Sequence, residues 1–108
     1  MRLGLAELLS RHTDIDVVGH AKDGLMAVEL VRQIHPQVIV MDVNMPGMDG
    51  IEATSIITQE FADIRVVGIS MHDEPEVRDA MLSAGARTFL AKDGPPEGLV
   101  AAIRGISW

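Results

Sequence analysis

The apolar positions of this chain follow two different spacings. Segments that repeat apolar residues every three or four positions are typical of amphipathic helices, and such helices are predicted over residues 1–12, 25–34, 51–61, 76–84 and 97–104. Short apolar runs between these segments predict strands at residues 16–21, 38–41, 65–70 and 88–91. This alternation predicts an α/β fold, a doubly wound parallel sheet with helices on both faces, and residues 1–108 as a single domain.

The run at residues 38–41 consists of four consecutive apolar residues and is rich in β-branching. Such a run is typical of a parallel strand that is buried on both faces. Turn and cap residues separate the other elements: His35-Pro36 should end the second helix, and Gly85 should cap the fourth. Pro96 stands where the first turn of the last helix tolerates proline.

Three predicted strands end on polar side chains, namely Asp42, Ser70 and Lys92. Because the carboxyl ends of parallel strands meet at one edge of a sheet, we expect these groups to converge. A carboxylate can attack phosphorus, while an ammonium and a hydroxyl stabilise the added anionic oxygens. The Asp42 carboxylate and the backbone carbonyl of Asn44 are hard oxygen ligands that suit Mg²⁺. Taken singly, each residue also has a structural explanation as a turn former, strand end or solvated charge.

Residues 38–50, VIVMDVNMPGMDG, resemble the phosphoacceptor segment of response-regulator receiver domains of bacterial two-component signalling. The segments VVGISMHD and FLAKD resemble the fourth and fifth strands of the same family, and KDGPP is typical of the subclass fused to a helix-turn-helix output domain. The resemblance implies a flavodoxin-like (CheY-like) fold. It also implies that Asp42 accepts a phosphoryl group from a histidine kinase or phosphotransfer protein, with Mg²⁺ as cofactor. Ser70 and Lys92 would contact that group.

Phe89, three residues before Lys92, matches the family's switch aromatic, which moves inward when the strand-end hydroxyl moves towards the phosphoryl group. An ordinary core aromatic is the competing interpretation. His72 matches a variable position that modulates phosphoryl lifetime, although a solvated loop histidine would explain it equally well.

The resemblance begins inside the family's first helix, so the first strand and its acidic pair are expected to be absent. Mg²⁺ would then have only Asp42 and the Asn44 carbonyl, a weak site, and phosphorylation should be slow or lost. The family's sheet order is 2-1-3-4-5, so the missing strand would leave backbone groups unpaired inside the sheet. A rearranged or intertwined homodimer is the favoured response. A piece of a longer receiver, or a start codon assigned too late, would leave the same sequence.

Composition limits the remaining choices. Hydrophobic residues make up 47% of the chain but aromatic residues only 3%, so the core should be aliphatic. The net charge of −7 argues against direct nucleic-acid binding, which needs clustered basic residues. No apolar run approaches the roughly 18 residues of a membrane helix, and the absence of cysteine fits a cytoplasmic location.

Three alternatives remain beside the phosphorylated receiver, which is not itself expected to be an enzyme. A degenerate receiver would act as a phosphorylation-independent interaction module. A small phosphatase with an aspartyl nucleophile would need a second aspartate two residues after Asp42, where this chain has Asn44. A flavin-binding protein shares the architecture, but the loops lack an evident Ser/Thr-rich phosphate cradle.

Overall fold

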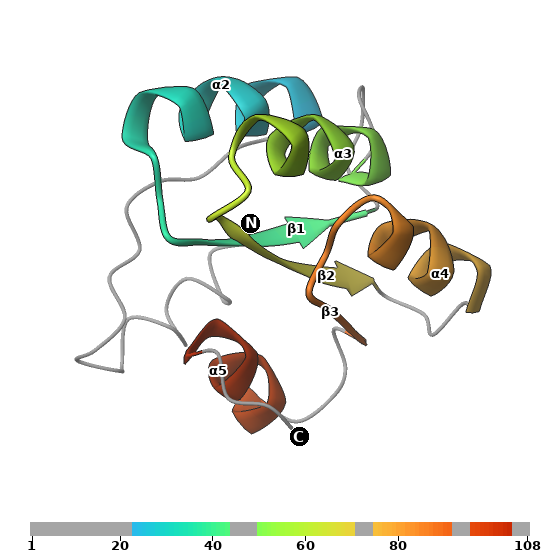
Figure 1. The fold of residues 1–108 in the computed structure, drawn as a ribbon. Coiled ribbons are helices and arrows are strands. Elements are labelled where there is room, and N and C mark those ends of the chain that lie inside the picture. Colours follow the sequence, from blue (N-terminus) through green and yellow to red (C-terminus); the bar gives the residue numbers. More distant parts are fainter. Residues whose placement is uncertain (1–22, 44–49, 71–74, 92–95, 105–108) are drawn as a thin grey trace.

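The computed structural model describes residues 23–43, 50–70, 75–91 and 96–104 (Figure 1). The helix predicted at residues 1–12 and the strand predicted at residues 16–21 lie outside these residues. The described segments form the expected α/β arrangement, with strands and helices alternating along the chain.

Three strands form a parallel sheet in the order β1-β2-β3. Their bounds are Val38–Asp42 for β1, Arg65–Ser70 for β2 and Thr88–Ala91 for β3. Strand β1 pairs with β2 from Val38↔Arg65 to Asp42↔Ile69, and β2 pairs with β3 from Val67↔Thr88 to Ser70↔Ala91. All three strands therefore end at the same edge of the sheet, and the prediction of a parallel sheet is confirmed.

The helices match the predicted segments to within one residue at each end. Their bounds are Gly24–Ile34 for α2, Gly50–Glu60 for α3, Pro75–Ser83 for α4 and Pro96–Arg104 for α5. The prediction placed the start of each helix one residue late, because each helix begins at a glycine or proline beside its cap, and apolar spacing does not mark such a residue. At α2 that cap is Asp23, whose carboxylate accepts a 2.8 Å hydrogen bond from the Met26 N–H.

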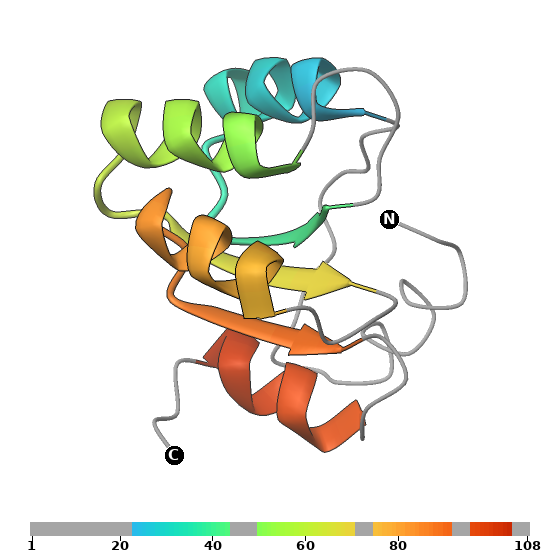
Figure 2. The ribbon, with the colours of Figure 1, turned by 90° about the vertical axis from the view of Figure 1, so that its right-hand side faces the viewer.

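The helices cover the two faces of the sheet in separate layers. Helices α2 and α3 lie over one face, with α4 beside α3 along β2 and β3, and α5 lies over the opposite face (Figure 2). Alternate residues of β2 therefore enter different cores. Val66 packs with α2, α3 and α4, whereas Val67 and Ile69 pack with α5.

Strand β1 is less buried than its sequence predicted. Val38, Ile39 and Val40 are half-buried, and only Met41 is fully buried, at 1% exposure. The reason is position in the described sheet, where β1 pairs with β2 alone, while β2 has a strand on each side and is buried from Val66 onwards. A continuous apolar run shows only that its residues are apolar. It fits an edge strand of the sheet as well as a central strand.

Among the described residues, no helix is long and apolar enough to span a membrane.

Candidate functional site

Asp42 and Ser70 lie at the carboxyl ends of adjacent strands, as the sequence predicts. Asp42 is the last residue of β1 and pairs in register with Ile69, so Ser70 stands one position further along β2. Asp42 is half-buried, whereas Ser70 is 1% exposed. The edge thus presents a carboxylate that solvent can reach beside a hydroxyl that is enclosed by the protein.

The backbone of Asp42 is held from two directions. The Val43 N–H donates a 3.1 Å hydrogen bond to the Ile69 carbonyl, which extends the pairing of β1 and β2 beyond Asp42. On the other side, Gly50 begins α3 in close contact with the strand end. A Cβ at Gly50 would lie 2.8 Å from the Asp42 carbonyl oxygen and 2.9 Å from the Val43 Cα, so only glycine fits without a shift. Gly50 is the first residue of α3, one position before the predicted start at residue 51, and its missing side chain lets the helix reach the strand.

Ser70 faces the core under α3 and α4. It follows Gly68 by two residues on β2, and side chains alternate across a strand, so both residues belong to the same face of the sheet. At Gly68, a Cβ would lie 2.8 Å from both the Met81 methyl group and the Phe89 ring. Ser70 is thus next to the part of the core that the Phe89 ring occupies.

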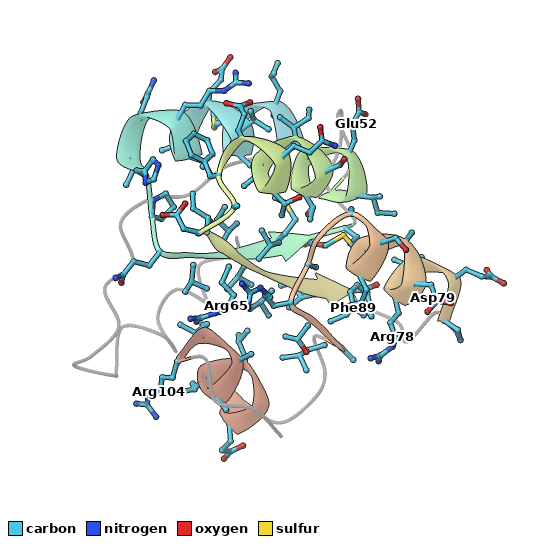
Figure 3. The ribbon with its side chains drawn as sticks, in the orientation of Figure 1. Glu52, Arg65, Arg78, Asp79, Phe89 and Arg104 are labelled. Carbon is cyan, nitrogen blue, oxygen red and sulfur yellow. The ribbon has the colours of Figure 1, made fainter. Side chains whose placement is uncertain are left out.

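Phe89 is a core residue, 2% exposed, and it pairs in register with Gly68. The Arg78 guanidinium of α4 lies over its ring, with the guanidinium carbon 5.6 Å from the ring centroid (Figure 3). The structure confirms the buried aromatic but does not test whether it moves.

Lys92, Asn44 and His72 lie outside the described residues, so their predicted roles stay predictions. Within the segments that are described, no three carboxylate or imidazole side chains gather into a group that could hold a metal ion. Asp42 itself supplies one hard oxygen ligand at the open edge of the sheet, which fits the chemistry of a Mg²⁺ ion that keeps most of its water.

The family model for the response regulator receiver domain matches residues 1–104. This chain belongs to that family. The three described strands of this receiver also lie in the order that the family's third, fourth and fifth strands follow.

Known proteins similar to this receiver are regulators. The transcriptional regulatory protein LiaR of Bacillus subtilis is 37% identical over 107 residues, 99% of this chain and 51% of LiaR. The transcriptional regulatory protein DegU of Brevibacillus brevis is 36% identical over 103 residues, 95% of this chain and 44% of DegU. The receiver thus spans about half the length of these curated relatives.

A solved signal receiver domain, from the response regulator NarL of Mycobacterium tuberculosis, superposes with a TM-score of 0.88 at 37% identity. The match covers 94% of this chain and 82% of that domain. It confirms the predicted CheY-like fold.

Sequence reasoning missed three residues that shape the edge of this receiver, namely Gly50, Gly68 and Arg78. The two glycines matter because they lack a side chain, and no spacing rule in the sequence reveals which atoms a Cβ at these positions would contact. Arg78 had a weak signal, because it stands three residues before the buried Met81 on the same face of α4. Its contact with Phe89 requires the tertiary structure.

Proposed function

We propose that this receiver carries a phosphoryl group on Asp42 and that Asp42 is the phosphoacceptor for a histidine kinase or phosphotransfer protein. The observation that carries the proposal is the position of a half-buried carboxylate and a buried hydroxyl at the carboxyl ends of two adjacent parallel strands. Receiver domains interact with histidine kinases or phosphotransfer proteins, and family membership supports the same partners here.

The chemistry follows from these groups. An Asp42 carboxylate oxygen forms a bond to phosphorus while the bond from phosphorus to the donor breaks, and the bonding electron pair leaves with the donor group. The acceptor must be positioned before attack. The hydrogen bond from the Val43 N–H to the Ile69 carbonyl and the close approach of Gly50 fix the backbone of Asp42 in position. The Ser70 hydroxyl would donate a hydrogen bond to a phosphoryl oxygen, and the Lys92 ammonium would offset part of the charge.

Receiver domains use Mg²⁺ for phosphorylation. In this chain the Asp42 carboxylate and the Asn44 backbone carbonyl would hold the ion, with water completing its shell. When bound, Mg²⁺ would neutralise charge on the phosphoryl oxygens. Its binding here should be weak, since these two ligands are few for a cation that gives up water reluctantly.

The test is intact-mass spectrometry after incubation with Mg²⁺ and a small acyl phosphate. Because Mg²⁺ binding is weak, we expect one phosphoryl group to be added slowly in the wild type and none in Asp42→Asn, while Asp79→Asn, which changes an exposed aspartate on α4, should behave as the wild type. A wild-type protein that gains no mass would overturn the phosphoacceptor proposal. It would favour a phosphorylation-independent interaction module, in which Asp42→Asn leaves partner binding unchanged.

We also propose that the receiver forms a homodimer in the cytoplasm. The supporting observation is the partly exposed apolar start of β1, at Val38, Ile39 and Val40, which a second copy would cover. Light scattering coupled to size-exclusion chromatography should give twice the mass of one chain. A single-chain mass that persists as the concentration rises would contradict the dimer.

A further inference from the structure

Helix α4 is firmly attached at its C-terminal end. The Ala86 N–H donates to the Met81 carbonyl at 3.0 Å and the Gly85 N–H donates to the Leu82 carbonyl at 3.1 Å, with Gly85 at φ +115°. These two bonds form a Schellman motif. The Thr58 hydroxyl of α3 also donates to the Ala84 carbonyl at 2.6 Å. The end of α4 is therefore tied to α3.

The middle of α4 faces the core through Met81, which is fully buried. Its sulfur accepts a weak hydrogen bond from the Thr54 hydroxyl at 3.8 Å, and its methyl group lies over Gly68. One turn earlier on the same face stands Arg78, which is half-buried. The C-terminal half of α4 is thus held by several contacts. One turn earlier in the helix, the Arg78 side chain contacts Phe89 of β3.

The Phe89 ring is enclosed by these groups. Gly68 lies opposite it on the neighbouring strand, Met81 packs in the same core, and the Arg78 guanidinium lies over the ring. A cation over an aromatic face is attracted by the ring's electron density, and the attraction grows as water is excluded. Arg78 therefore stabilises the ring in its buried position.

We infer that Arg78 is a positioning residue that holds Phe89 buried before any phosphorylation, so that α4 and β3 are preset in one arrangement beside Ser70. The role of this arrangement in signalling rests on the function proposed above. The buried position of the Phe89 ring does not rest on that function, because it is a property of the unmodified protein. A receiver preset in this way would change little at α4 and β3 when Asp42 is phosphorylated.

The chain has only two phenylalanines and no tyrosine, so NMR of ¹³C-labelled phenylalanine rings reports on Phe89 with little overlap. In the unphosphorylated wild type, we expect strong cross-peaks from the Phe89 ring to the Met81 methyl group and upfield-shifted Arg78 side-chain protons. Phe89→Leu should remove that upfield shift. Its absence in the wild type would by itself overturn the inference, without any need for a folded arginine variant.

Arg78→Met keeps the length of the side chain and removes its charge. We expect the population with an exposed ring to rise by about threefold to tenfold, the effect of losing one partly buried cation–π contact, and the cross-peaks to weaken accordingly. Arg78→Lys should restore most of the wild-type spectrum. The matched control is Arg87→Met, since Arg87 is exposed and its backbone N–H bond to Val66 does not depend on the side chain.

Equal cross-peaks in Arg78→Met and Arg87→Met would show that packing alone buries the ring and would overturn the inference. The outcome is separate from the phosphoacceptor test, because none of these spectra requires phosphate. Comparing spectra before and after acyl-phosphate treatment then measures the response of α4 and β3, which should be larger in Arg78→Met than in the wild type if Asp42 accepts phosphate.

Discussion

Glycine at position 50 is as much a part of the Asp42 edge as any polar side chain. Its missing Cβ lets the first turn of α3 rest against the backbone of Asp42 and Val43. Because backbone atoms on a paired strand cannot yield as a flexible side chain can, an added methyl group must displace the helix or the strand end.

We therefore expect Gly50→Ala to destabilise the protein by about 1–3 kcal/mol, as overpacking does elsewhere, and to slow phosphoryl transfer to Asp42. Denaturant unfolding measures the first effect and intact-mass time courses measure the second. Gly98→Ala is the matched control, because a Cβ at Gly98 meets nothing within 4 Å. In the first turn of α5 it should stabilise the protein by about 0.5–1 kcal/mol. Unfolding free energies that move equally in both variants would contradict this account.

At the scale of elements, Thr58 joins two helices through a single hydroxyl. Its single hydroxyl hydrogen is shared between the Thr54 carbonyl of its own helix at 2.9 Å and the Ala84 carbonyl after α4 at 2.6 Å. Thr58→Val keeps the shape and removes the donor, so we expect a loss of about 1 kcal/mol in unfolding free energy. The control is Ser55→Ala, which removes only an acceptor for the exposed Gln59 amide and should change stability by less. A smaller loss in Thr58→Val than in Ser55→Ala would argue against this link.

Helices α2 and α3 are joined by a different kind of contact. The Arg32 guanidinium donates two hydrogen bonds to the Glu60 carboxylate, the Nε bond at 3.0 Å. These bonds, with the charge of Arg32, hold the pKa of Glu60 below its ordinary value of 4.5. The ion pair therefore contributes stability above about pH 4.5, and that contribution is lost as the pH falls through the lowered pKa.

Both side chains are exposed, so the effect should be small and sensitive to salt. Thermal unfolding between pH 6 and pH 3 should show a slightly steeper acid loss of stability in the wild type than in Glu60→Gln. The difference should shrink at high salt. Parallel pH profiles at low salt would show that the pair does not stabilise the junction of α2 and α3.

The helices and strands could be predicted because apolar spacing and cap residues are local features of the sequence. Apolar spacing found every described helix to within one residue, and the αL conformation of His35, at φ 56°, closes α2 where His35-Pro36 predicted its end. The predicted convergence of Asp42 and Ser70 followed from parallel topology. The burial of β1 and the contact between Arg78 and Phe89 could not be predicted, because both depend on which elements become neighbours in space.

For the molecule as a whole, β2 is the strand on which both cores depend. Among the described strands it alone has neighbours on both sides, and its residues enter the core on each face of the sheet. The Arg65 side chain, at its first residue, donates a 2.7 Å hydrogen bond to the Ile103 carbonyl near the end of α5 (Figure 3). The two layers are thus linked through β2.

Hydrogen exchange should follow this arrangement. We expect the backbone amides of Arg65–Ser70 to exchange more slowly than those of Val38–Asp42, since in the described sheet opening β2 breaks two strand pairings while opening β1 breaks one. Exchange measured by mass spectrometry on overlapping peptides resolves the two strands. Equal protection in the unliganded protein would mean that β1 is covered on its outer side in solution, as the proposed homodimer would do.

The carboxyl edge of the sheet also has a consequence for protein synthesis. Residues 42, 70 and 91 end the three strands at this edge. Strand β2, which pairs with both β1 and β3, is synthesised second of the three. A chain still growing on the ribosome already contains Asp42 but has neither the paired strand that fixes its backbone nor the core that encloses Ser70. Under the phosphoacceptor role proposed above, a kinase that meets such an unfinished chain finds an aspartate without its folded surroundings, so signalling has to wait until translation has passed β3 and the sheet has closed.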